Sequence, residues 1–292
     1  MKKISVFTAL IVALGLFSCE PGDDALDSLI ASEIDVASEA GMSASFEEVD
    51  QIVEDGIEHC YNKPQNSDGR HGRFGNYRFG RLTDCTEITR DTVNQIITID
   101  FGEGCEDIQG TVRSGIIKIA YNELRNVPGA YRIVSFEDFF VDSVGVEGTR
   151  TITNISEEAD SLSRSFEVLL EGGKLSFPDE STITRDAEHE RTSYITEDRS
   201  EAYSAITGSA QGVLRSGTAY TVTILEEIIY KHGCRDERVV IPVSGIKEIR
   251  AGEDVVLINF GDGTCDNLVE ITINGETTVR EIEPRGRKRR RG

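Results

Sequence analysis

The sequence predicts a mainly β protein. We expect antiparallel sheets, arranged as a sandwich or an extended meander of two similar parts, with one short N-terminal helix. From Ile88 onward, apolar and polar residues alternate with period two in several short runs, which is the pattern of half-buried strands. Glycine-containing polar turns separate these runs. No convincing helical periodicity follows residue 85, so strand follows strand, as in antiparallel sheets.

Residues 1–18 have the order of a secretory signal peptide. Lys2 and Lys3 precede an apolar run of about a dozen residues, which is too short to cross roughly 30 Å of hydrocarbon as a helix. The run ends in Leu-Phe-Ser-Cys, which resembles a bacterial lipobox, in which the Cys becomes the lipidated first residue. We therefore expect Cys19 to carry a lipid such as palmitate. That lipid would anchor the chain to the outer membrane, with its body at the cell surface or on the periplasmic face.

The segment behind Cys19 is acidic. Residues 19–44 contain no Lys or Arg, and we expect a solvated tether. Residues 45–60 predict a helix, because Ser45 and Glu48 fit a capping box and apolar residues recur at helical spacing. The apolar stripe consists of Phe46, Val49, Ile52, Val53 and Ile57. Such a stripe is typical of a packing face, and the alternative is a helix that docks on a partner.

Residues 61–84 predict a loop rich in Gly, Arg and aromatic residues. Bases and aromatics alternate in it, as in some RNA-binding segments. The formal net charge of the chain is −21, however, and this opposes nucleic-acid binding. We therefore expect no nucleic-acid partner, and we interpret the segment as a loop that contacts the acidic helix or a surface polysaccharide.

The β region divides into two expected parts, residues 85–170 and 171–283. Its alternating apolar residues are Ile97, Ile99 and Phe101; Ile117, Ile119 and Tyr121; Phe166, Val168 and Leu170; Tyr220, Val222 and Ile224; and Val256, Ile258 and Phe260. Their enrichment in β-branched and aromatic types supports half-buried strands.

Two short sequence elements recur in the β region. Ile-Asp-Phe-Gly-Glu-Gly-Cys at 99–105 matches Ile-Asn-Phe-Gly-Asp-Gly-Thr-Cys at 258–265. Gln-Gly-Thr-Val-Arg-Ser-Gly at 109–115 matches Gln-Gly-Val-Leu-Arg-Ser-Gly at 211–217. The two pairs are offset by different amounts, so we interpret them as recurrent hairpin elements and not as one tandem duplication.

The chain has six Cys residues, and assigning one to the lipid leaves five in an exported, oxidising setting. Each Phe-Gly-x-Gly element ends near a Cys and has an earlier Cys within reach, so that each pair closes a hairpin. The predicted disulfides are Cys85–Cys105 and Cys234–Cys265, with Cys60 left over.

No motif points to catalysis. A Walker-type phosphate loop, a nucleophile elbow and a His-Glu-x-x-His pattern are all missing from the sequence, and there is no Cys-x-x-Cys spacing for zinc. Acidic turns at 103–107 and 262–266 offer oxygens for Ca²⁺, but solvated turns are the simpler interpretation. We expect no enzyme activity, no metal and no cofactor. Carboxylate pairs for glycoside hydrolysis stay open, because the chain has 52 acids.

Residues 284–292 form a basic tail. We interpret it as a disordered, solvated segment. The alternatives are contacts with the acidic N-terminal region, with lipopolysaccharide phosphates or with acidic glycans.

Several stretches carry a family resemblance. Beside the lipobox and its trailing acids, these are Val-Glu-Gly-Thr-Arg-Thr-Ile-Thr-Asn at 146–154, Ile-Thr-Gly-Ser-Ala-Gln-Gly at 206–212 and Asn-Phe-Gly-Asp-Gly-Thr-Cys-Asp-Asn at 259–267. Together they resemble a family of surface lipoproteins of Bacteroidetes-type bacteria that has no assigned activity. The resemblance covers about residues 45–283 and implies an address without implying a reaction.

These observations predict a lipid-anchored, exported, β-rich envelope protein with a structural, adhesion or ligand-binding role. Its expected partners are the membrane, through Cys19, and a surface glycan or an outer-membrane protein. One alternative is a surface glycan-binding or glycan-hydrolysing lipoprotein. Another is an accessory subunit of an outer-membrane transporter that docks through the helix.

Overall fold

A computed structural model describes residues 23–62, 81–158, 162–196, 198, 200–234, 239 and 241–282 of the chain. The predicted signal peptide, Cys19, most of the Gly/Arg/aromatic loop and the basic tail lie outside these residues.

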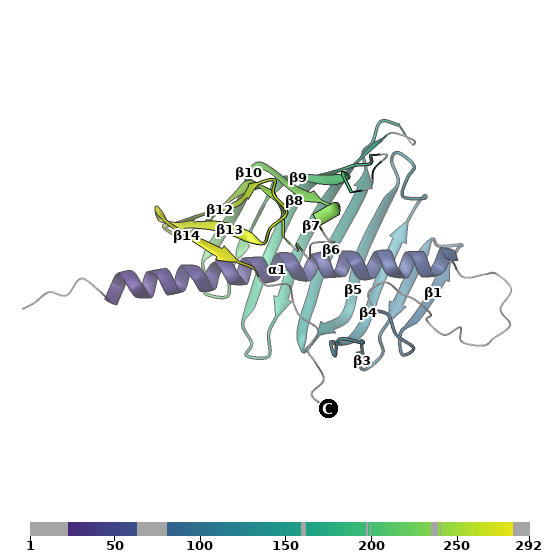
Figure 1. The fold of residues 1–292 in the computed structure, drawn as a ribbon. Helices are drawn as coiled ribbons and strands as arrows, with labels where there is room; N and C mark the ends of the chain where they lie inside the picture. Colours follow the sequence, from purple (N-terminus) through teal and green to yellow (C-terminus); the bar gives the residue numbers. More distant parts are fainter. Residues whose placement is uncertain are drawn as a thin grey trace, which may run out of the picture.

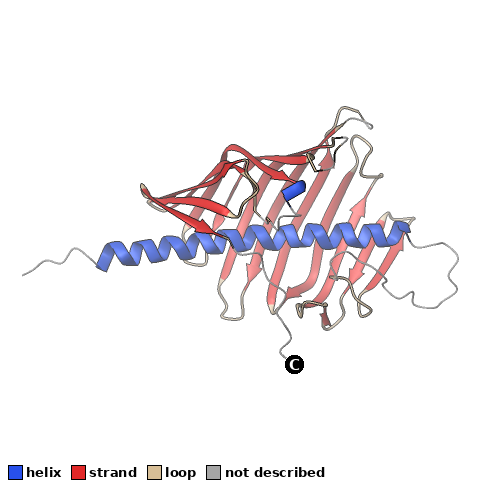
Figure 2. Cartoon of the chain, in the orientation of Figure 1, coloured by secondary structure: helices blue, strands red, loops and turns tan. Residues whose placement is uncertain are grey.

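The described chain is one helix followed by strands (Figures 1 and 2). The elements are α1 (Asp23–Asn62), β1 (Glu87–Asp91), β2 (Ile96–Asp100), β3 (Cys105–Glu106), β4 (Val112–Tyr121), β5 (Tyr131–Val141), β6 (Val144–Asn154), β7 (Ser163–Ser176), β8 (Thr182–Tyr194), β9 (Tyr203–Val213), β10 (Ala219–Lys231), β11 (Ser244–Ala251), β12 (Asp254–Asp262), β13 (Leu268–Ile273) and β14 (Glu276–Glu281).

The strands form one open antiparallel meander. The sheet has 14 strands, which follow one another in chain order from β1 to β14. The short strand β3 lies off this path and pairs with the first residues of β4, Val112 and Arg113. The mainly β prediction is therefore confirmed, and of its two arrangements the meander is the one that forms. The expected boundary at residue 170 falls inside β7, which pairs with β8 from Ser163 to Ser176, so the sheet continues across it without a break.

Helix α1 lies across one face of this sheet and crosses the strands (Figure 1). It begins at Asp23, well before the expected start at Ser45, so the predicted acidic tether is helical from Asp23 onward. Ser45 is an interior residue of the helix and does not cap it: its hydroxyl donates a hydrogen bond to the carbonyl of Gly41 at 2.9 Å, the backward bond that Ser makes inside helices.

The apolar stripe of the helix is a packing face, as predicted. Phe46, Val49, Ile52 and Val53 are buried together with Met42, one turn earlier. They belong to one core cluster with the inward-facing residues of the sheet. The strand alternation is confirmed in the same way, since Ile97, Ile99, Ile117, Ile119, Phe166, Val168, Leu170, Tyr220, Val222, Val256 and Ile258 are all buried.

Gly56 marks a close approach between helix and sheet. A Cβ atom at this position would lie 2.5 Å from Cδ1 of Ile99 on β2. The absence of a side chain on Gly56 therefore lets this end of α1 settle onto the first strands. That contact fixes the position of the next helical residues, Ile57 and Glu58.

Both predicted disulfides are present. Cys85 and Cys105 are joined with Cα atoms 5.6 Å apart, and this bridge closes the β1–β2 hairpin. Cys234 and Cys265 are joined with Cα atoms 5.2 Å apart. The second bridge differs from the expectation that each pair closes a hairpin: Cys234 follows β10 and Cys265 follows β12, so the bridge links two loops at the same end of the sheet.

Candidate ligand-binding site

Acidic residues of α1 meet basic residues of the sheet and of its connections, since Arg81 precedes β1 and Arg125 lies between β4 and β5. The ion pairs are Glu39 with Arg185 and Lys247, Glu48 with Arg113, Asp50 with Arg150, Glu54 with Arg125 and Arg132, and Asp55 with Arg81. The basic partners lie far from the helix in sequence. The ion pairs therefore form a row of polar contacts along α1, beside the apolar core.

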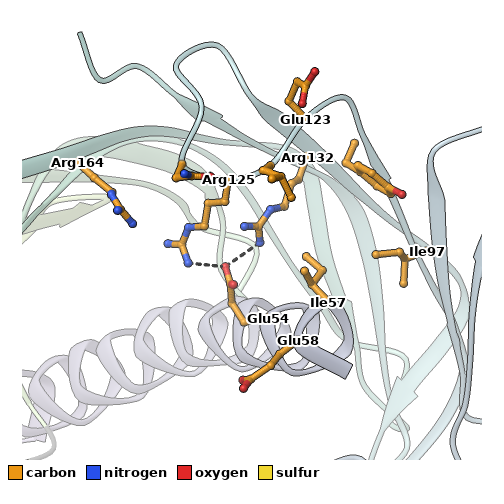
Figure 3. Close-up of a pocket in the computed structure, with 11 residues that line it drawn as sticks. Glu54, Ile57, Glu58, Ile97, Glu123, Arg125, Arg132 and Arg164 are labelled. Atoms are coloured by element: carbon orange, nitrogen blue, oxygen red, sulfur yellow. Dashed lines mark hydrogen bonds and ion pairs between the residues drawn. The ribbon is translucent and has the colours of Figure 1, made fainter. Parts of the chain in front are cut away.

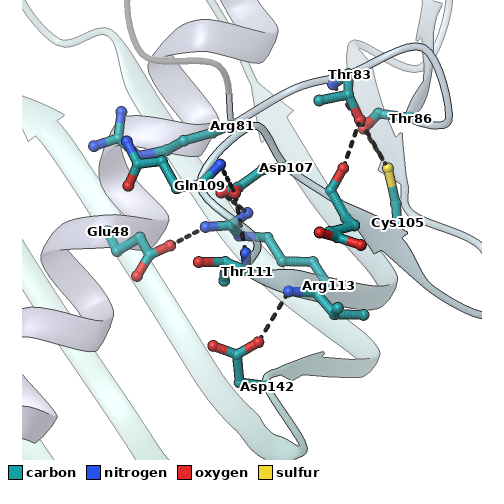
Figure 4. Close-up of polar contacts among 12 residues, drawn as sticks. Glu48, Arg81, Thr83, Thr86, Cys105, Asp107, Gln109, Thr111, Arg113 and Asp142 are labelled. Carbon is teal, nitrogen blue, oxygen red and sulfur yellow. Dashed lines mark hydrogen bonds and ion pairs between the residues drawn. The ribbon is translucent and has the colours of Figure 1, made fainter. Parts of the chain in front are cut away.

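The Glu48 pair belongs to a buried cluster that fixes the hairpin after β3 (Figure 4). The Arg113 guanidinium binds Glu48 and also donates to Asp107 Oδ2 at 2.8 Å. Asp107 Oδ1 accepts the backbone N–H groups of Gln109 at 2.7 Å and Thr111 at 3.0 Å. Burial raises the pKa of Asp107, but Arg113 and these N–H groups outweigh it and hold the pKa below its usual value. Through Arg113, these contacts connect the acidic turn between β3 and β4 to Glu48 on α1.

The Glu54 pair borders a pocket of about 320 Å³ between the last turns of α1 and the sheet (Figure 3). This volume lies within the range of about 300–1,000 Å³ that is typical of small-molecule sites. Its walls come from α1, from β2, β4, β5 and β7, and from the β4–β5 connection. The lining residues are Glu54, Ile57, Glu58, Ile97, Tyr121, Glu123, Leu124, Arg125, Asn126, Arg132 and Arg164.

One wall of the pocket is cationic. Oε1 of Glu54 lies 2.9 Å from Nη1 of Arg125 and 2.7 Å from Nη1 of Arg132, so one carboxylate serves two guanidinium groups. Arg164, on β7, points toward Arg125 in Figure 3. Its buried Nε has no hydrogen-bond acceptor among the described residues.

The positive charges of neighbouring arginines repel that of Arg125. Burial lowers the pKa of Arg125, and although Glu54 opposes this, the positive charges of Arg132, Arg191 and Arg164 lower it further. The guanidinium carbon of Arg125 lies 4.7 Å from the ring centre of Phe166. That stacking holds the side chain in place despite the repulsion.

Another part of the pocket wall is apolar. Ile57 comes from the helix, Ile97 from β2 and Leu124 from the β4–β5 connection, and the ring of Tyr121 lies at the end of β4. The carboxylates of Glu58 and Glu123 point away from the guanidinium groups (Figure 3). The pocket is thus amphipathic, with two walls of different chemistry.

None of these arginines belongs to a motif or repeat that predicted a site. Arg132 alternates with exposed Ile133 and shares the inward face of β5 with buried Val134, and Arg164 shares the inward face of β7 with Phe166. A base at an inward position of an alternating strand is the signal that would have found Arg132 and Arg164, whereas Arg125 lies in the β4–β5 connection and carries no such signal. The four disulfide cysteines do not line the pocket, and Cys19 lies outside the described residues.

The predicted absence of a metal site stays a prediction. Within the described ranges, no group of three or more His, Cys, Asp or Glu residues is placed to hold a metal ion. Across the same residues, α1 included, no helical stretch combines the length and hydropathy of a membrane span. Comparisons with protein-family models, with curated proteins and with solved structures found no match.

Proposed function

We propose that this chain is an exported, lipid-anchored envelope protein that binds a small ligand without catalysing a reaction. The observation that carries the proposal is the preformed pocket between α1 and the sheet, which has the volume of a ligand site and two chemically distinct walls. The lipobox at Cys19 supplies the anchor. The two disulfides support the exported address, because such bonds persist in oxidising compartments.

The geometry favours ligand binding over the other roles. An accessory subunit that docked through the helix would need an exposed apolar stripe, but Phe46, Val49 and Ile52 are buried against the sheet. Glycoside hydrolysis needs a pair of available carboxyl groups. The carboxylate of Glu54 is already bound by two arginines, so it is not available to a substrate.

Membrane fractionation and palmitate labelling test the anchor. The Cys19→Ala variant is expected to lose both, because the lipid is attached through that thiol. Cys60→Ala is the matched control, since Cys60 takes part in neither disulfide, and this variant should still label and pellet with membranes. Labelling of Cys19→Ala at the level of the natural chain would contradict the anchor.

A thermal-shift screen tests the pocket. The library should contain uncharged, cationic and anionic small molecules, neutral sugars included, since glycan binding is the alternative role. Leu124→Trp should abolish the shift caused by any hit, because Leu124 lines the pocket and the larger ring fills it. No hit of any charge, or hits unaffected by Leu124→Trp, would refute ligand binding at this site.

A further inference from the structure

Three arginines and three glutamates line the pocket, but Glu58 and Glu123 point away from the guanidinium groups (Figure 3). Arg164 points toward Arg125, and Glu54 is the carboxylate placed between Arg125 and Arg132. Ion pairs occupy Arg125 and Arg132, whereas the buried Nε of Arg164 lacks an acceptor. A buried donor without an acceptor costs free energy that a bound anion would recover.

The arginines of the pocket already bind one carboxylate of the chain. Glu54 presents a carboxylate, and two guanidinium groups hold it at 2.7 and 2.9 Å, the distances of charge-assisted hydrogen bonds. Each guanidinium has five N–H donors in a planar fork, so Arg125 keeps donors for a second carboxylate after binding Glu54.

The rest of the pocket shows what such an anion should be attached to. Ile57, Ile97 and Leu124 form the apolar wall of the pocket. Burying an apolar body against that wall is favourable in proportion to the area removed from water. A bare inorganic anion would leave this wall without a partner.

We propose that the pocket binds a small organic carboxylate with an apolar body. The ligand carboxylate lies between Arg164 and Arg125, and its hydrocarbon part packs against Ile57, Ile97 and Leu124. Glu54 occupies donors of Arg125 and Arg132 and so competes with the ligand for them. This inference rests on the proposed ligand-binding function and adds the chemical class of the ligand.

Titration calorimetry with hexanoate and benzoate is the direct test. The chain should carry Cys19→Ala and be purified without detergent, because detergents are amphiphiles that compete for the same pocket. Hexanoate should bind at least tenfold more tightly than acetate, which lacks the apolar body, and than hexanamide, which lacks the charge. Inorganic phosphate should bind no better than acetate. Equal affinity for hexanoate and hexanamide would overturn the role of the carboxylate.

Arg164→Gln identifies the binding group. This variant should bind hexanoate at least tenfold more weakly, because it loses a charged donor at the ligand. Arg215→Gln is the matched control. Arg215 stacks on Phe177 at 4.0 Å and pairs with Asp179 at 2.7 Å, as Arg125 does with Phe166 and Glu54, but it does not line the pocket. An equal loss in both variants would refute the site.

Glu54→Gln tests whether Glu54 competes with the ligand for the arginine donors. Without its charge, Arg125 and Arg132 become available to the ligand, so hexanoate should bind more tightly than to the natural chain. Weaker binding by a still folded variant would refute the assigned role of Glu54. If the library screen finds a neutral or cationic ligand that Leu124→Trp abolishes, the binding function stands and the carboxylate inference fails. If no compound binds, both fail.

Discussion

The carboxylate of Glu39 on α1 accepts a hydrogen bond from the guanidinium of Arg185 on β8 at 2.5 Å, although the two residues lie 146 positions apart. Glu39 is 0% exposed, and Nζ of Lys247 on β11 lies 3.1 Å from its other oxygen. Burial raises the pKa of Glu39, but Lys247 and Arg185 outweigh it and lower the pKa to about 2. These two ion pairs, the Glu39 latch, hold α1 against the sheet in the segment where a solvated tether was expected.

Replacing Glu39 should strongly destabilise the protein. Glu39→Gln leaves Arg185 and Lys247 buried with a neutral partner, and breaking a buried ion pair costs about 3–5 kcal/mol. Urea unfolding measures the loss. The control is Glu147→Gln, which removes the exposed pair with Lys174 and should cost less than about 1 kcal/mol. Equal losses in the two variants would contradict the latch.

His189 should make stability depend on mild acid. Burial lowers the pKa of His189 to about 4, Arg185, Arg150 and Lys247 add to this, and Glu39 opposes it. Below pH 6.5 the unfolded chain therefore binds a proton that the folded chain does not, so the free energy of unfolding falls between about pH 6.5 and 4. His189→Gln should flatten this part of the pH profile, as followed by unfolding at each pH. An unchanged slope would refute the assignment.

Removing the acid of the buried turn should be costly as well. Asp107→Ala leaves the Arg113 side chain, which is 2% exposed, with one carboxylate fewer, and it frees two backbone N–H groups. We expect a loss of about 3–5 kcal/mol, measured by urea unfolding. Asp262→Ala is the comparison in the related acidic turn. Asp262 is exposed and accepts hydrogen bonds from Thr264 in the same turn, so this variant should unfold nearly as the natural chain does.

Gly115 should tolerate no side chain. Its φ is +81°, and a Cβ atom would lie 2.0 Å from the carbonyl oxygen of Asp138. Gly115→Ala should therefore cost more than about 2 kcal/mol, because strain and a backbone clash add. Gly217, the matching glycine of the repeated Arg-Ser-Gly element, has φ +86° and nothing within 4 Å. Gly217→Ala should cost only the backbone term of about 1 kcal/mol, as thermal unfolding of both variants will show.

The comparison of these two glycines shows where local sequence similarity stops predicting structure. The first copy of the repeat places Arg113 inside β4, facing the core, while the second places Arg215 in the turn after β9. The disulfide pairing of the cysteines in the other repeat, at 99–105 and 258–265, was predicted correctly. A disulfide needs only that two residues are brought close by neighbouring strands. Side-chain burial depends instead on strand register, which seven residues do not specify.

The sequence by itself determined the mainly β class, the inward residues of the strands, the apolar face of the helix and both disulfides. These features follow from period-two and helical spacing and from cysteine spacing, which are local properties. Only the tertiary structure decided that the sheet is one continuous meander, that the helix extends back to Asp23, and that Arg125, Arg132 and Arg164 share a pocket. Those outcomes depend on which strand lies under which turn of the helix, and such long-range register leaves no periodic signal in the chain.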